Sequence, residues 1–131
     1  MQKGLITLLL LITIQVCHAQ FKLQSGQPIT IAVDQAEKSV VNTALQLFSR
    51  DYQVVFSAAA NKNSKQGNII IGTIGQSTLP ELTYVDTSFL KGKKQAFILT
   101  VLPNHKLLII GSDSHGTAYG IMELSRLIGV S

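Results

Sequence analysis

The stretch 106–131 constrains the fold of this chain more than any other part of the sequence. A short apolar run, 107–110, is closed by Gly111, and beyond a polar turn the apolar residues recur at helical spacing. This change of period predicts a strand, a tight loop and a helix. Gly116 and Gly120 lie four positions apart on one face of that helix, which would let it sit close to a sheet.

The same helix is predicted to end at a glycine and to be unusually apolar. Gly129 suits a left-handed C-terminal cap, and only two residues follow it. The apolar residues of the helix occupy more than the single stripe that covers one face of a sheet: Ala118, Tyr119, Ile121, Met122, Leu124, Leu127 and Ile128. We therefore expect part of the helix to pack against something outside this domain.

The N-terminus has the pattern of a secretory signal peptide. A basic start at Lys3 is followed by an almost wholly apolar run, 5–16, and by a small residue, Ala19. We predict cleavage after Ala19, which divides the chain into a signal peptide, 1–19, and a mature domain, 20–131. A membrane anchor is the alternative, but the apolar run is shorter than the roughly 20 residues that a spanning helix needs. We expect a secreted or periplasmic protein that is not held by the membrane after cleavage.

Composition excludes several classes of protein. Cleavage would remove Lys3 and the only cysteine, Cys17, so the formal charge would fall from +4 to +3 and no disulfide could form. The basic residues are spread along the chain apart from Lys91, Lys93 and Lys94, and aromatic residues do not interleave with them. We therefore expect no nucleic-acid partner and interpret this cluster as a solvated loop.

The remaining sequence predicts an α+β domain. Asp34 and Glu37 have the spacing of a capping box, and the run 68–73 is apolar enough for a central strand covered on both faces. Residues 103–105 separate two strands as a hairpin turn would. The predicted elements are strands over 28–33, 53–56, 68–73, 95–102 and 106–111, a helix over 35–51, an exposed connection over 58–67, and one helical turn over 77–82 with Ser77 or Thr78 as its cap and Pro80 in its first turn. This order indicates a mixed β-sheet flanked by two main helices.

The loop Gly111–Gly116 joins a buried strand to a helix N-terminus, where backbone N–H groups favour anions. It does not match the phosphate-binding loop, because Thr117 and Ala118 stand where Lys and Ser or Thr are required, and its glycine spacing does not match the dinucleotide fingerprint. We interpret the glycines as permitting a tight turn and close packing.

The loop also contains the residue types of a hydrolytic triad: Ser112, Asp113, Ser114 and His115. Neighbours on one short turn cannot form a relay in which base and orienting group approach from different directions. We predict instead that Asp113 or Ser114 caps the helix and that His115 is exposed.

No other group of residues predicts chemistry. His105, in the hairpin turn, and His115 have no metal-ligand spacing between them. The acidic candidates each have a structural interpretation as a cap, a loop residue or part of a helix face: Asp34, Asp86, Asp113 and Glu123. We predict no catalytic, cofactor-binding or metal-binding residue in this chain, and no cofactor.

Three runs, 69–75, 90–97 and 109–131, carry a family resemblance. The most specific part is the pattern Gly-Ser-Asp-x-x-Gly-Thr-x-Tyr-Gly-Ile, followed by Leu-Ser and by Ile-Gly-Val-Ser. Together these runs resemble the N-terminal domain of family 115 glycoside hydrolases, the xylan α-1,2-glucuronidases. A looser likeness extends to the N-terminal domains of family 67 α-glucuronidases and of β-hexosaminidases. The departures are a short polar segment, 77–88, and His115, where a basic residue is common.

The resemblance implies a small accessory domain of a multidomain glycoside hydrolase. In such enzymes a following (β/α)8-like barrel removes glucuronic acid side groups from xylan, and that barrel would follow Ser131. We therefore expect a fragment of a secreted enzyme of plant cell-wall degradation that is inactive alone and meets glucuronoxylan through the full-length enzyme.

Two other functions stay open from the sequence. One is a free-standing secreted carbohydrate-binding module that holds an acidic polysaccharide through Lys91, Lys93 and Lys94. Sugar-binding modules usually offer aromatic platforms, whereas this chain has no Trp, and Phe48, Phe97 and Tyr119 are placed for the core. The other is a small independent hydrolase that uses Asp113.

Overall fold

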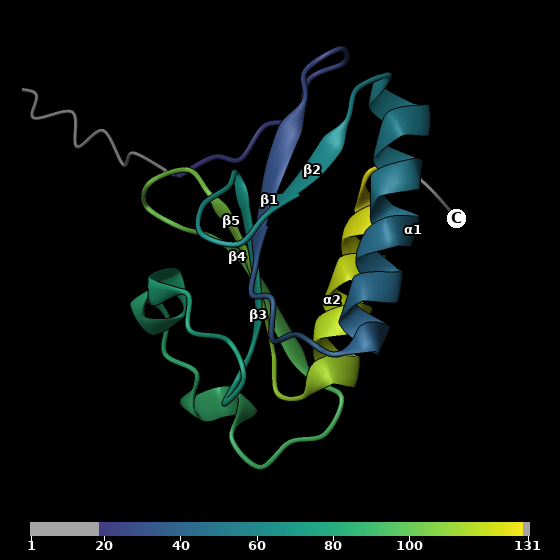
Figure 1. Ribbon diagram of the computed structural model, residues 1–131. Coiled ribbons are helices and arrows are strands. Elements are labelled where there is room, and N and C mark those ends of the chain that lie inside the picture. The colour runs from purple at the N-terminus through teal and green to yellow at the C-terminus, as the bar shows by residue number, and fades with distance from the viewer. Residues whose placement is uncertain (1–18, 130–131) are drawn as a thin grey trace, which may run out of the picture.

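The computed structural model describes residues 19–129 (Figure 1). The predicted signal peptide, apart from its last residue, and the last two residues of the chain lie outside the described residues. Within residues 19–129, no helix combines the length and the hydrophobicity that are needed to cross a bilayer.

One mixed five-stranded sheet forms the centre of the domain, with its strands in the order β2-β1-β3-β5-β4. The strands are β1 (Ile29–Val33), β2 (Ala60–Asn63), β3 (Ile69–Thr73), β4 (Phe97–Val101) and β5 (Leu107–Gly111). The first four in this spatial order run parallel, and β4 pairs antiparallel with β5 at one edge. The mixed sheet of the predicted α+β class is confirmed.

Both main helices cover the same face of the sheet. Helices α1 (Ser39–Phe56) and α2 (Ser114–Leu127) pack against each other and against the strands, while the segment that contains the short 3-10 helices η1 (Pro80–Tyr84) and η2 (Ser88–Leu90) lies over the opposite face (Figure 1). The domain therefore has three layers: two helices, the sheet and an irregular cover.

The central strand β3 contributes to both cores. Ile69 and Ile71 join the cluster beneath the two helices, whereas Ile70 joins the smaller cluster beneath η1 and η2. All three side chains are fully buried, as are those of the neighbouring β5 strand on both of its faces. The prediction of a central strand covered on both sides is confirmed, and the hairpin 95–111 is confirmed by the β4–β5 pairing with His105 in its turn at a φ of 64°.

Helix α1 begins and ends later than the sequence predicted. It starts at Ser39 after Lys38, which makes no side-chain capping bond, so the capping box of Asp34 and Glu37 is wrong. It also includes 53–56, which was predicted as a strand. The reason is aromatic spacing: Phe56 stacks on Tyr52 with ring centroids 4.6 Å apart, and this contact continues the helical apolar face for another turn.

Two other elements differ from prediction at the surface. The connection 58–67 contains β2, a polar edge strand that pairs with β1 through its backbone while its side chains are mostly exposed. The predicted turn over 77–82 is the 3-10 helix η1, which has Pro80 in its first turn as expected. Its N-cap is Leu79, however, because Ser77 and Thr78 are engaged elsewhere.

Candidate functional site

A buried polar cluster lies at the carboxyl ends of β1 and β3, which is the edge where α/β folds commonly bind ligands. Glu37 follows β1, Thr73 ends β3 and Thr117 lies in the first turn of α2, and all three side chains are buried. The Thr73 hydroxyl donates to the Glu37 carboxylate at 3.0 Å, and the other carboxylate oxygen accepts from the Ser77 hydroxyl. The Oγ1 atoms of Thr73 and Thr117 are 2.6 Å apart. The carboxylate thus has a hydroxyl partner on each oxygen.

Asp34 makes a second connection along the same edge. One of its carboxylate oxygens accepts from the backbone N–H of Ala36 at 2.9 Å, and the other accepts from the backbone and hydroxyl of Thr78 at 3.0 and 2.7 Å. These hydrogen bonds, with Ala36 as the largest contribution, lower the pKa of Asp34 below its ordinary value. Asp34 and Glu37 together hold the segment after β3 against the segment after β1.

The loop Gly111–Gly116 ends in a helix cap. The Asp113 side chain accepts from the backbone N–H of Gly116 at 2.7 Å and from that of Gln95 at 3.0 Å, so it both caps α2 and anchors the strand β4. The bond from Gln95 is the larger cause of a pKa of Asp113 that is lower than usual. The prediction of a cap is confirmed for Asp113, and His115 is exposed as expected.

The glycines of this loop are required by close packing. A Cβ atom at Gly111 would meet the backbone and hydroxyl of Thr117, and one at Gly116 would meet the backbone carbonyl of Ala96. At Gly120 a Cβ would lie 2.5 Å from a methyl carbon of Ile109 on β5. The prediction that Gly116 and Gly120 bring the helix close to the sheet is confirmed.

The carboxylates of this edge connect separate segments of the fold. A general acid in glycoside hydrolysis needs a raised pKa so that it carries a proton at neutral pH, whereas the pKa values of Asp34 and Asp113 are lowered by hydrogen bonds. Both oxygens of Asp113 accept hydrogen bonds from backbone N–H groups. Among residues 19–129, no three His, Cys, Asp or Glu side chains gather as a metal site requires.

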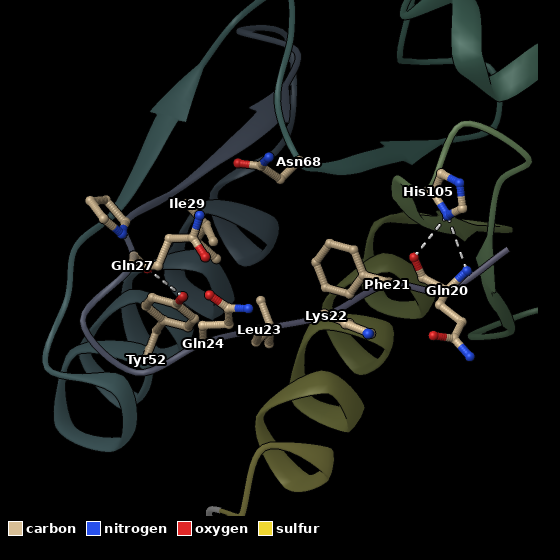
Figure 2. A pocket seen from close by; sticks show the side chains of 11 residues that line it. Gln20, Phe21, Lys22, Leu23, Gln24, Gln27, Ile29, Tyr52, Asn68 and His105 are labelled. Carbon is tan, nitrogen blue, oxygen red and sulfur yellow. Dashed lines mark hydrogen bonds between the residues drawn. The ribbon is translucent and has the colours of Figure 1, made fainter.

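A separate pocket of about 430 Å³ opens near the N-terminal segment (Figure 2). Phe21 and Leu23 pack partly against the main core, and the Tyr52 hydroxyl donates to the carbonyl of Gln27 at 2.7 Å. Burial raises the pKa of Tyr52. His105 reaches the backbone of Gln20 from the hairpin turn, with its Nδ1 3.2 Å from both the nitrogen and the oxygen (Figure 2). The pocket thus forms where the N-terminal segment crosses the amino-terminal end of the sheet.

The two helices leave an apolar groove on the outside of the domain. Its volume is about 720 Å³, and its apolar lining includes Leu47 from α1, Phe97 from β4, and Tyr119 and Met122 from α2. Tyr119, Met122 and Leu127 are exposed, whereas Ala118, Ile121 and Leu124 are buried against the core. Tyr119 was predicted for the core and lies at the surface instead. As the sequence indicated, α2 has more apolar surface than this domain covers.

The predicted basic cluster lies between η2 and β4. Lys91, Lys93 and Lys94 are exposed, as expected of a solvated loop. The side chain of Lys93 extends over Phe89, with its ammonium nitrogen 3.4 Å from the ring centroid. Phe89 is itself 63% exposed, an aromatic surface that sequence reasoning missed because a lone Phe in a short segment gives no periodic signal.

Comparisons with known proteins found a similar solved structure. No protein-family model and no curated protein matches the chain. A solved structure does: it is described as a family GH115 4-O-methyl-alpha-glucuronidase, BtGH115A, with specificity for decorated arabinogalactans, and it shares 59% sequence identity with this chain at a TM-score of 0.82. The match covers 86% of this chain and 15% of that chain, so this chain spans a domain-sized part of its relative. The shared sequence and fold confirm the predicted resemblance of this chain to the N-terminal domain of family 115 glycoside hydrolases.

Proposed function

We propose that this chain is the non-catalytic N-terminal domain of a secreted α-glucuronidase that removes glucuronic acid side groups from a plant cell-wall polysaccharide. The observation that supports this most directly is the 59% identity to a part of BtGH115A that makes up 15% of that chain. At this identity and a TM-score of 0.82 the two domains share their fold. The activity of the relative therefore suggests the activity of the enzyme to which this domain belongs.

The hydrogen bonding of the acidic residues supports a non-catalytic role. Asp34, Glu37 and Asp113 each connect two segments of the fold through backbone or hydroxyl donors. Carboxylates that act as acid and base in glycoside hydrolysis must instead face a bound sugar with opposed protonation states. We place that pair outside this domain, in the part of the enzyme that follows it.

The apolar groove between α1 and α2 supports a role within a larger protein. We propose that it packs against the neighbouring domain of the same enzyme, because the part of the relative that matches this domain is only 15% of that chain. Met122 is 56% exposed in the isolated domain, and covering such side chains would stabilise the junction.

Sequence resemblance suggests glucuronoxylan as the polysaccharide, while the solved relative is described as specific for decorated arabinogalactans. Both substrates should be tested with protein expressed from the complete 131-residue chain. We expect no release of glucuronic acid or of its 4-O-methyl derivative from either. Release that Asp113→Ala abolishes would contradict a non-catalytic role and favour a small hydrolase.

Export of the enzyme is the other part of this proposal. We expect the N-terminus of the exported protein to lie near Gln20, and N-terminal sequencing of secreted or periplasmic material measures it. An intact Met1 in exported protein would contradict the proposed cleavage.

A further inference from the structure

We propose that the exposed loop formed by Phe89, Lys91, Lys93 and Lys94, here called the basic aromatic loop, binds the carboxylate-bearing sugars of an acidic plant polysaccharide. This inference rests on the proposed function, which supplies a polysaccharide with uronate groups. It goes beyond that function by giving the accessory domain a binding surface of its own.

The loop has a fixed conformation. Leu90 is buried at the centre of the segment, and the Asp86 carboxylate accepts from the backbone N–H of Ser88 at 2.9 Å. The backbone N–H groups of Lys91 and Lys93 donate to the carbonyls of Ser88 and Leu90 at 3.2 and 3.1 Å. The far end is held by the bond from Gln95 to Asp113. A ligand would therefore meet side chains on a hydrogen-bonded backbone, so that ordering of the backbone adds little to the cost of binding.

The loop carries positive charge that no acidic side chain within residues 19–129 neutralises through an ion pair. The ion pair in residues 19–129 is Glu123 with Arg126 on α2, and all seven acidic residues of the chain lie within this range. Two carboxylates hydrogen-bond to residues that flank the loop: Asp86 accepts from the backbone N–H of Ser88, and Asp113 accepts from that of Gln95. The three lysine ammonium groups thus form no ion pair among residues 19–129, and that of Lys93 lies over the Phe89 ring.

Phe89 adds an apolar surface beside this charge. The ring is 63% exposed, and the ammonium group of Lys93 lies over it. The apolar face of a pyranose ring can pack on an aromatic ring, while a carboxylate on the same sugar reaches an ammonium group. The Phe89 ring offers an apolar surface for the sugar ring, and the Lys93 ammonium group, 3.4 Å from the ring centroid, offers a positive charge for the carboxylate of the same uronic acid.

The same features disfavour a nucleic acid as the ligand. Nucleic-acid affinity depends on many phosphate contacts, and here the concentrated charge is limited to one short loop. A uronate side group needs only one or two cations. The loop begins at η2, on the face of the sheet opposite the two helices (Figure 1). None of its four named residues lines the apolar groove, so a polysaccharide bound to them would not occupy the groove.

The test is native gel electrophoresis of purified protein in gels that contain glucuronoxylan. The matched polymer is the same glucuronoxylan after chemical reduction of its carboxyl groups to alcohols. We expect retardation by glucuronoxylan, weaker retardation by the reduced polymer, and a decrease of the effect as salt is raised. Equal mobility in both gels and in a gel without polymer, or equal retardation by both polymers, would overturn the inference.

Variants locate the binding surface. Replacing the three loop lysines by glutamine should abolish the difference between the polymers, and Phe89→Ala should reduce retardation by both. The control carries the same loss of charge elsewhere on the surface: Lys22→Gln, Lys38→Gln and Lys65→Gln. Circular dichroism verifies that each variant is folded. A loop-lysine variant that is retarded like the control would contradict this assignment.

The readout is separate from that of the proposed function. Retardation measures binding by this domain, whereas release of glucuronic acid measures catalysis. A domain that is not retarded and releases no sugar would contradict only the basic aromatic loop. A domain that is retarded and does release sugar would contradict only the non-catalytic role.

Discussion

The hydroxyl oxygens of Thr73 and Thr117 lie 2.6 Å apart in the buried interior, although the two residues are 44 positions apart in the chain. Through this contact the first turn of α2 is joined to the end of β3. The Thr117 hydroxyl also approaches the carbonyl of Gly72 at 3.1 Å, and Thr73 continues the network to Glu37. Three segments of the chain thus meet at one set of hydrogen bonds.

Removing the Thr117 hydroxyl should therefore destabilise the domain. Thr117→Val preserves the shape of the side chain and removes a buried hydroxyl that contacts Thr73 and the carbonyl of Gly72, a loss of about 1–3 kcal/mol in the free energy of unfolding. Urea unfolding followed by circular dichroism measures the change. Thr43→Val, at an exposed position of α1, is the matched control and should change stability little. Equal stability of both variants would show that the network contributes nothing.

The loss of stability caused by alanine at each glycine of α2 should depend on which atoms the new methyl group meets. Alanine is a better helix former than glycine by about 1 kcal/mol, so each substitution would raise the stability of the domain if the added methyl group fitted without a clash. Gly116→Ala should destabilise more than Gly120→Ala, because the first places a methyl group against the backbone of Ala96 and the second against side chains that can move. Ser125→Ala on the same helix is the control, and the melting temperatures of the three variants give the order. A Gly116→Ala variant as stable as wild type would contradict the close packing described here.

Acid should weaken the domain in part through Asp113. Its pKa is lowered in the folded state, chiefly by the N–H of Gln95. Its stabilising contribution is therefore complete above the unfolded value of about 3.9 and is lost as the pH falls through the lower folded value. Asp113→Asn should show a shallower loss of stability below about pH 4 than wild type. Asp51→Asn on α1 serves as the comparison, and an Asp113→Asn profile parallel to that of wild type would be inconsistent with this account.

The groove between α1 and α2 should make the isolated domain self-associate. Met122→Gln, within the groove, is expected to lower both the sedimentation coefficient at high protein concentration and the fluorescence of a hydrophobic dye. Val54→Gln is the control, because Val54 is 76% exposed on α1 but does not line the groove. A monomeric wild-type protein that binds no dye would show that the helix needs no further partner.

The sequence predicted the parts of this fold in which burial leaves a pattern. The isoleucine run of β3, the hairpin and the cap at Asp113 were all predicted from local features, because an apolar period or a capping side chain is visible in a few neighbouring residues. The family resemblance extended this to the identity of the domain.

The errors occurred where local patterns were misleading or absent. Strand β2 is an edge strand whose polar side chains stay in water, so no apolar alternation marks it. Val54 and Val55 have strand propensity but lie on the exposed side of α1. The helix continues through them because the buried Tyr52 and the partly buried Phe56 stack at helical spacing.

Long-range contacts explain the part of the candidate site that sequence reasoning missed. Glu37 was predicted to cap a helix, whereas its hydroxyl partners Thr73 and Ser77 lie 36 and 40 positions away. Nothing in the local sequence indicates that this carboxylate is buried. Only the topology, which places β3 beside β1, brings the partners to it.

The most direct measurement of the central claim is the activity of a chimera. In BtGH115A the segment that matches this chain would be replaced by the aligned residues of this chain, and release of 4-O-methylglucuronic acid would be compared with that of the parent enzyme. We predict that the chimera keeps activity of the same order, because a non-catalytic domain with 59% identity retains its packing surface, and that Met122→Glu in the groove lowers its melting temperature. A folded chimera that has lost the activity would contradict the proposal that this chain is an accessory domain of such an enzyme.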